Sequence, residues 1–212
     1  MGPEGQNRGP LGLDIEGMRT LEVRWIFAGP VPTAMARWIG AFPAQTIVLE
    51  DTYLVHPHMP GLSVKVREGR TLEVKAYDGS PGLIEVPKRA RGRLEAWRKW
   101  SFPCDPVSRD SDPAGWRTVR KRRRISRFAR VGGSAVPRAP GAGDESECAV
   151  ELAEFRALGD DWWTLGFEAT GPAPALRGEL DAAAALVFGR ALPGEVELDT
   201  SGCMSYAQWL RR

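Results

Sequence analysis

The stretch Gly61–Tyr77 constrains the fold more than any other part of the chain, because it consists of two short alternating runs around a glycine-bearing turn at residues 68–70. Period-two alternation on both sides of such a turn predicts a β-hairpin. One face of this hairpin is apolar, and the other is charged. The charged face carries Lys65, Arg67, Glu73 and Lys75. This face either meets solvent, as in an ordinary half-buried antiparallel sheet, or lines the inside of a barrel around an anionic ligand.

Further segments with the same alternation predict strands along most of the chain. They are Met18–Phe27, Thr46–Val55, Arg91–Phe102, Trp116–Phe128, Glu147–Ala157 and Trp162–Gly171. A helix is an alternative for Arg91–Phe102. Apolar residues at helical spacing predict three helices, at Thr33–Phe42, Leu176–Leu192 and Ser205–Arg212. Because many of these strands carry charge on their second face, we predict an α+β fold. Its main part is an antiparallel eight-stranded β-barrel, or tunnel, with a few helices packed outside.

The chain has 212 residues, of which 42% are hydrophobic and 26% charged, as expected for a globular protein. Residues 1–17 are rich in Gly and Pro and lack the basic-then-apolar pattern of a signal peptide, so we expect a disordered tail. Residues 18–212 are expected to form a single tunnel domain. Within it, the low-complexity segment near residues 131–146 is expected to be a flexible loop.

Cysteine usage and hydropathy bear on the compartment of the protein. The three cysteines, Cys104, Cys148 and Cys203, are widely separated, which predicts reduced thiols in a cytoplasmic protein. No run approaches the roughly 18 apolar residues of a membrane span, so we expect no membrane partner. The only histidines, His56 and His58, form a pair in a proline-flanked loop, and one such pair rarely completes a metal site.

The most basic segment is Trp116–Phe128, which contains five consecutive basic residues at 120–124 although the net charge of the chain is only +2. Such a run can be a solvated face or a nucleic-acid patch. If it is a strand, alternate basic side chains would point into the barrel and outward from it. The sequence does not fix which residues point inward, and nucleic-acid binding stays open as the less favoured alternative.

Taken in order, these pieces resemble the CYTH family, the triphosphate tunnel metalloenzymes. The matching motifs are DTYL at 51–54, VKVR at 64–67, LEVK at 72–75, RLE at 93–95, VRKRR at 119–123, VEL at 150–152, LGFE at 165–168 and SY at 205–206. The resemblance covers roughly Met18 to Leu210 and rests on the order and spacing of the motifs together. It implies an antiparallel eight-stranded tunnel whose basic residues grip a triphosphate and whose carboxylates hold Mg²⁺ or Mn²⁺.

The resemblance also implies a set of site residues. The expected catalytic residues and metal ligands are Glu22, Glu151 and Glu168. The expected phosphate-binding residues are Arg24, Lys65, Arg67, Lys75, Lys121 and Arg123, and Glu73 and Glu95 are expected to line the tunnel. Gathering several cations in one barrel is costly unless anions compensate them, and a polyphosphate supplies those anions.

The chain departs from the family's acidic pattern in three places. Against Glu-x-Glu-x-Lys it reads EVRWI at residues 22–26, against Glu-x-Asp it reads ELA at 151–153, and against Glu-x-Glu it reads EAT at 168–170. One acid therefore remains of each pair. Hard divalent cations need several oxygen ligands, so three carboxylates could hold one ion with the help of substrate phosphates, but would not hold two.

Three functions are consistent with these observations. The first is a divergent, metal-dependent phosphohydrolase that acts on inorganic triphosphate or an organic triphosphate. The second is a catalytically degenerate barrel that binds polyphosphate or nucleotide, in which Arg24 adds a cation where the metal would sit. The third is an RNA- or protein-interaction module that uses the basic run Arg117–Arg130. The first two share an anionic, phosphate-rich ligand.

Overall fold

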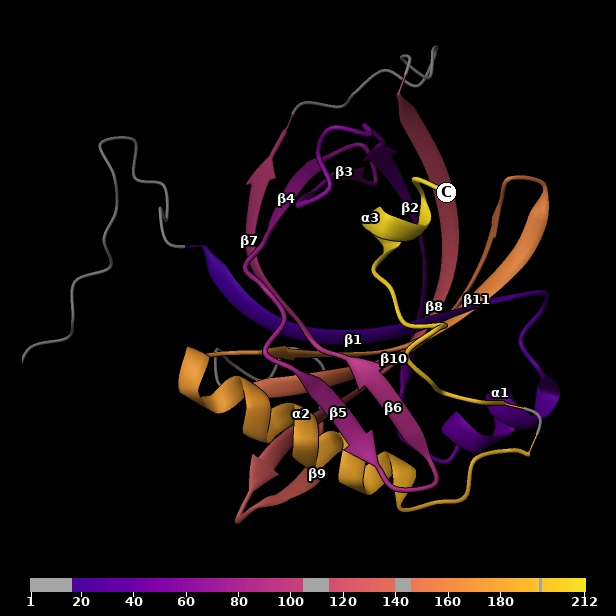
Figure 1. Ribbon diagram of the computed structural model, residues 1–212, viewed down its shortest axis with the longest axis vertical. Helices are drawn as coiled ribbons and strands as arrows, with labels where there is room; N and C mark the ends of the chain where they lie inside the picture. Colours follow the sequence, from indigo (N-terminus) through magenta and orange to yellow (C-terminus); the bar gives the residue numbers. More distant parts are fainter. Residues whose placement is uncertain (1–16, 105–114, 140–145, 195) are drawn as a thin grey trace, which may run out of the picture.

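Eight strands close into a barrel in the computed structural model, which describes residues 17–104, 115–139, 146–194 and 196–212. In order around the barrel, they are β10 (Glu147–Ala157), β11 (Asp160–Thr170), β1 (Met18–Ala28), β7 (Glu95–Pro103), β4 (Thr71–Tyr77), β3 (Leu62–Arg67), β2 (Gln45–Leu54) and β8 (Trp116–Val131). Strand β8 pairs back with β10, and every neighbouring pair is antiparallel (Figure 1). The predicted α+β fold with an eight-stranded antiparallel barrel is confirmed.

Three short strands lie outside this ring. Strand β9 (Ser134–Arg138) pairs with the end of β8, and β5 (Leu83–Val86) pairs with β6 (Ala90–Arg93) in a separate hairpin. Strand β9 occupies part of the segment that we expected to be a flexible loop. Gly132 and Gly133 have φ angles of 57° and 89°, and this left-handed turn lets the chain fold back onto β8. Residues 140–145 and 1–16, the rest of the expected loop and nearly all of the expected tail, lie outside the described residues.

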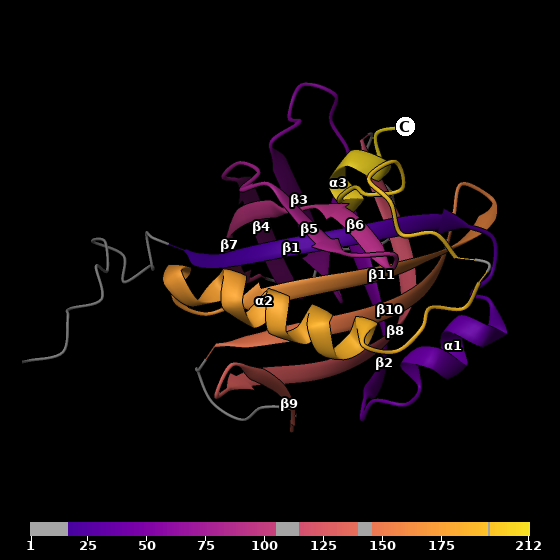
Figure 2. The ribbon, with the colours of Figure 1, turned by 60° about the horizontal axis from the view of Figure 1, so that its bottom comes forward.

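The main hydrophobic core lies outside the barrel, between helix α2 (Ala173–Phe188) and the outer faces of β1, β10 and β11 (Figure 2). Successive side chains of a strand point to opposite faces of the sheet. Val23, Val150 and Phe167 therefore enter this core, while the residues next to them point into the barrel. A one-residue slip of any of these strands would bring its charged face into the core, so burial on one side fixes the register.

Helix α1 (Thr33–Ile39) adds Met35, Trp38 and Ile39 to the same core. Leu94 is fully buried in it as well. It interrupts the segment Arg91–Phe102, which we predicted to be one strand and which forms β6 and β7 instead.

The short helix α3 (Tyr206–Trp209) lies across one end of the barrel, whereas α2 packs on its outside as expected (Figure 1). Ser205 begins this helix with a reciprocal capping box to Gln208. Trp209 and Leu210 belong to a second hydrophobic cluster with the inward-facing residues Ile26, Tyr53, Val119 and Phe155. This cluster covers one end of the tunnel. None of the helices in the described part of the chain is long and apolar enough to cross a membrane.

Candidate functional site

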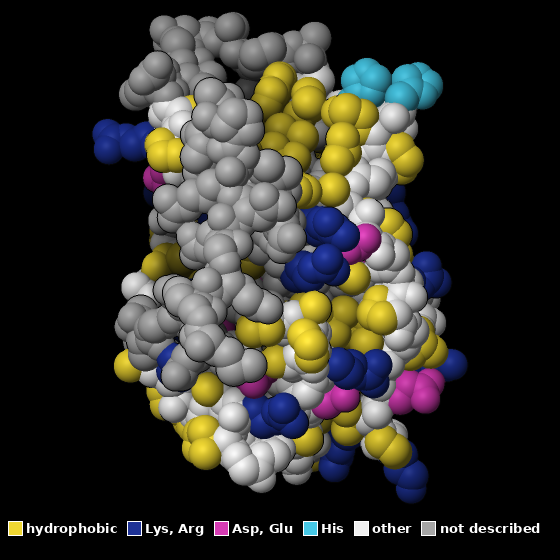
Figure 3. All heavy atoms as spheres, turned by 90° about the vertical axis from the view of Figure 1, so that its left-hand side faces the viewer, with side chains coloured by type: hydrophobic (Ala, Val, Ile, Leu, Met, Phe, Trp, Pro, Cys, Tyr) yellow, Lys and Arg dark blue, Asp and Glu magenta, His cyan; other side chains and the backbone are white. Residues whose placement is uncertain are grey.

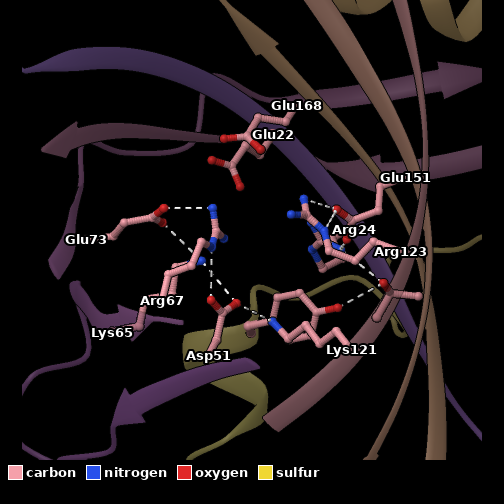
Figure 4. Close-up of polar contacts among 12 residues, drawn as sticks. Glu22, Arg24, Asp51, Lys65, Arg67, Glu73, Lys121, Arg123, Glu151 and Glu168 are labelled. Carbon is pink, nitrogen blue, oxygen red and sulfur yellow. Dashed lines mark hydrogen bonds and ion pairs between the residues drawn. The ribbon is translucent and has the colours of Figure 1, made fainter. Parts of the chain in front are cut away.

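The inner faces of the eight strands enclose a cavity of about 480 Å³. Its wall is rich in charged side chains because these residues alternate with the ones that enter the outer core. Every site residue predicted from the sequence lies on this wall, namely Glu22, Arg24, Lys65, Arg67, Glu73, Lys75, Glu95, Lys121, Arg123, Glu151 and Glu168. Figure 4 shows most of them pointing toward one another across the tunnel. All of them except Glu95, which accepts a hydrogen bond from Trp97 Nε1 at 3.2 Å, belong to three clusters of opposite charges.

The first cluster surrounds Asp51, whose side chain is only 1% exposed. Lys65 Nζ and Lys121 Nζ each lie 3.3 Å from Asp51 Oδ2, and Arg67 Nε donates a hydrogen bond to Oδ1 at 3.0 Å. Burial alone would raise the pKa of Asp51, but the three cations outweigh it and hold this pKa well below its usual range. Asp51 is therefore a carboxylate at neutral pH.

Glu73 lies on β4 and is the second carboxylate of this cluster. It contacts two of the cations that surround Asp51, and also Lys99. Lys65 Nζ lies 3.1 Å from Oε2 of Glu73, Arg67 Nη1 lies 2.7 Å from Oε1, and Lys99 Nζ lies 3.8 Å from Oε2. With Lys121 included, four cations thus face two carboxylates. The first cluster carries a surplus of two positive charges when all its members are ionised.

Lys121 is the most enclosed of these cations, with 3% of its side chain exposed. It donates a hydrogen bond to the hydroxyl of Tyr53, and its Nζ lies 3.5 Å from the centre of the Tyr206 ring. Burial lowers the pKa of Lys121 well below its usual value, and attraction to Asp51 offsets only part of this effect. Burial also lowers the pKa of Lys65. For both lysines, burial has a larger effect on the pKa than attraction to the neighbouring carboxylates.

Replacing Lys121 by methionine is therefore expected to raise the free energy of unfolding by about 1 kcal/mol in phosphate-free buffer. The change removes a poorly compensated buried charge, and Asp51 keeps two other cations. Denaturant unfolding of both proteins measures the difference. Arg122→Met, an exposed change on the same strand, is the matched control and should alter stability by less than about 0.5 kcal/mol. A clear loss of stability in Lys121→Met would show that the charge is already compensated.

The second cluster joins Glu22 of β1 to Glu168 of β11, which are direct register partners. The ammonium of Lys75 contacts Glu22 Oε1 and lies 3.1 Å from Glu168 Oε1. Thr20 Oγ1 donates a further hydrogen bond to Glu22 at 2.7 Å. Burial would raise the pKa of Glu168, but Lys75 and Lys99 hold it well below its usual range. The carboxyl groups of Glu22 and Glu168 therefore share one ammonium group.

The third cluster is built on Glu151 of β10, which contacts two guanidinium groups. Arg24 Nη1 lies 2.9 Å from Glu151 Oε1, and Arg123 Nε donates a hydrogen bond to Oε2 at 2.6 Å. Burial would raise the pKa of Glu151, but Arg123 and Arg24 lower it to about 2. Arg24 Nη1 also donates to Thr164 Oγ1 at 3.0 Å, and its Cζ lies 4.5 Å from the centre of the Tyr206 ring. Several contacts thus fix the position of Arg24.

The expected metal ligands do not fit a resident divalent cation in this arrangement. Lys75 lies between Glu22 and Glu168, where such an ion would have to bind, and Glu151 faces two guanidinium groups. An ion at either place would meet a positive side chain at contact distance. Among the described residues, no group of three or more His, Cys, Asp or Glu side chains is arranged to hold a metal. The role of these glutamates as ligands stays a prediction.

Strand β8 divides the basic run between the two faces of the barrel wall. Lys121 and Arg123 line the cavity, whereas the residues that alternate with them, Arg120, Arg122 and Arg124, point outward. Only these three arginines of the five-residue run are thus available to the third function, which stays a prediction.

The two histidines, His56 and His58, lie in the loop after β2. They are exposed at one edge of the molecule (Figure 3), and their ring centres are 5.5 Å apart. Neither contributes to the wall of the cavity.

Among the tunnel residues that sequence reasoning did not assign to the site are Asp51, Lys99 and Tyr206. The first two could have been found, because Asp51 shares a strand face with Tyr53, and Lys99 shares one with Glu95. Tyr206 stands in the SY motif at 205–206, but a helix period does not reveal which end of a barrel the helix covers.

No family model matches the chain, and no curated protein matches it by sequence. Similar solved structures include HpAC1 from Hippeastrum, described as a putative adenylyl cyclase with a dominant triphosphatase activity (13% identity, TM-score 0.41, 84% of this chain and 91% of that chain covered). Others are the PH1819 protein from Pyrococcus horikoshii (11%, 0.43, 90% and 97%) and the Mimivirus capping enzyme triphosphatase (12%, 0.42, 81% and 88%). The pairing of β8 with β10 closes the strands of this chain into a tunnel. This is the architecture that the CYTH resemblance implies.

Proposed function

We propose that this divergent CYTH-like tunnel binds the phosphate chain of a triphosphate or a related polyphosphate anion. The first cluster carries the proposal, because its four cations share only two carboxylates on one wall of the cavity. A surplus of positive charge inside a protein is unfavourable unless an anion compensates it. A polyphosphate brings several negative charges in a row, and the guanidinium of Arg67 can meet them with paired hydrogen bonds.

The shape of the tunnel is also suitable for such a ligand. Its volume of about 480 Å³ lies within the range of small-molecule pockets, roughly 300–1,000 Å³. Because α3 and its hydrophobic cluster cover one end, a ligand would enter from the other end. An extended anion could then contact the first cluster with its leading phosphate groups.

Isothermal titration calorimetry with tripolyphosphate tests this proposal. We expect saturable binding of one anion per protein that weakens steeply with salt, because several charge pairs form. Orthophosphate and sulfate should bind far more weakly, since each spans fewer of the cations. Absence of tripolyphosphate binding, or equal affinity for sulfate, would contradict the proposal.

Polyphosphate binding is further expected to take up protons and to weaken as the pH rises. In the free protein, burial lowers the pKa of Lys121. At a pH between this lowered pKa and the usual pKa of lysine, Lys121 is therefore a neutral amine in a large fraction of the molecules. A bound anion raises this pKa again, and the amine then gains a proton. The number of protons taken up is obtained from the binding enthalpy, measured by calorimetry in buffers of different ionisation enthalpy. The Lys121→Met variant should take up fewer of them, and proton release on binding would contradict the account.

A second candidate function is metal-assisted hydrolysis of the bound phosphoanhydride. The observation that favours it is the register pair of Glu22 and Glu168, two carboxylates that a cation arriving with the ligand could contact if Lys75 moved aside. Phosphate release from tripolyphosphate, with and without Mg²⁺ or Mn²⁺, tests this candidate. If the protein is such a hydrolase, phosphate release must depend on the metal ion and must be lost in the Glu168→Gln variant. A wild-type protein that releases no phosphate under these conditions eliminates it.

A further inference from the structure

Basic side chains contact the expected metal ligands at the places in the tunnel where these ligands lie. Strands β1, β10 and β11 contribute Glu22, Glu151 and Glu168, and each of these carboxylates contacts a basic side chain directly. The basic partners are Arg24, Lys75 and Arg123. Arg24 of β1, Lys75 of β4 and Arg123 of β8 thus occupy the positions next to these carboxyl groups that a bound ion would need.

Arg24 has a defined place among these groups because the opposite strand makes room for it. Its register partner on β11 is Gly166, and a Cβ atom at that position would lie 3.0 Å from Arg24 Cζ and 3.1 Å from both terminal nitrogens. Contacts this short are tighter than most Cβ contacts in proteins, so with alanine at this position the guanidinium would have to shift by a few tenths of an ångström. Glycine is otherwise unfavourable within a strand, and here it permits a close approach.

The guanidinium of Arg24 is enclosed but still reaches the cavity. Its side chain is 13% exposed and forms part of the cavity wall, and Glu151, Thr164 and the Tyr206 ring hold it in place. A guanidinium keeps its proton at every pH at which proteins are stable. It therefore provides a positive charge that neither chelators nor pH can remove.

We infer that Arg24, in the space left by Gly166, takes the charge-neutralising role of a divalent metal on this wall, so that the tunnel binds polyphosphate without a metal. This inference rests on the proposed function and concerns how the anion is held. A divalent ion next to Arg24 or Lys75 would be repelled at contact distance, whereas an anion would be attracted. The Arg24–Gly166 pair is then the determinant of metal independence.

Calorimetric titration with tripolyphosphate in buffer containing a chelator tests this inference. Wild-type affinity should be unchanged by the chelator. Arg24→Gln should bind about 10- to 100-fold more weakly under the same conditions, the usual effect of losing one or more hydrogen bonds from a charged group. The matched control is Arg122→Gln, which removes the same charge from the outer face of the barrel and should bind like the wild type.

The outcomes separate the inference from the proposed function. If the chelator abolishes wild-type binding and Mg²⁺ or Mn²⁺ restores it, the inference is wrong and the proposed function stands. If no binding occurs with or without metal, the proposed function itself is wrong. Equal affinities of Arg24→Gln and Arg122→Gln would also overturn the inference. Glu151 keeps Arg123 in the Arg24→Gln variant, so we expect it to fold. If circular dichroism shows that Arg24→Gln does not fold, the Gly166→Val variant replaces it, because valine displaces the guanidinium without removing it. The inference then requires that Gly166→Val loses the same affinity for tripolyphosphate in buffer with chelator.

Discussion

Replacement of Asp51 by asparagine is expected to lower the free energy of unfolding by about 3–5 kcal/mol, the usual effect of removing one partner from a buried group of charges. Asp51 is the only carboxylate in the described part of the chain that contacts Lys121, and it also contacts Lys65 and Arg67. Without it, Glu73 alone would face four cations. Denaturant unfolding at neutral pH in phosphate-free buffer measures the loss.

The same variant should respond strongly to the proposed ligand. Tripolyphosphate replaces the missing negative charge, so it should stabilise Asp51→Asn more than it stabilises the wild type. The matched control is Asp181→Asn, which removes an exposed carboxylate paired with Arg177 on α2 and should change stability by less than about 1 kcal/mol. Equal and small effects of the two substitutions, or no added stabilisation by tripolyphosphate, would show that the first cluster does not carry surplus positive charge.

Replacement of Arg67 by methionine is expected to weaken tripolyphosphate binding by about 100-fold or more. Arg67 is the most exposed cation of the first cluster, at 27%, and Figure 4 shows its guanidinium extending toward the middle of the tunnel. Loss of two charge-assisted hydrogen bonds corresponds to this decrease, at about 1.5–3 kcal/mol each. The fold should be retained, because Asp51 and Glu73 keep other cations. Calorimetry gives the affinity, and circular dichroism checks the fold.

Two further variants make this prediction specific. Arg67→Lys keeps the charge but loses the planar fork, so its affinity should lie between those of the wild type and Arg67→Met. Arg122→Met removes a positive charge from the outer face and should bind normally. If Arg122→Met and Arg67→Met lose affinity equally, the anion responds to the overall charge of the protein and not to the tunnel.

The barrel could be predicted from the sequence because its charged and apolar faces alternate along almost every strand. The hairpin Gly61–Tyr77 showed this most clearly, and the structure places its charged face inside. The basic run on β8 was ambiguous, since Val119 and Ile125 face the interior while Phe128 faces the outer core. With apolar residues on both sides of the wall, alternation alone could not determine which arginines point inward.

The pairing of charges inside the tunnel could not be predicted from the sequence. Glu151, Arg24 and Arg123 come from three different strands, and their contacts depend on the register between those strands. The sequence did show that an arginine replaces an acid at position 24. It could not show that Gly166 lies opposite and leaves room for this arginine, because that pairing spans more than 140 residues of chain.

A crystal structure of the protein grown with tripolyphosphate would test the central claim most directly. The account predicts phosphate oxygens within hydrogen-bond distance of the Arg67 guanidinium and of Lys121 Nζ, inside the barrel. An anion bound instead along the outward arginines of β8, with the tunnel containing only water, would contradict it.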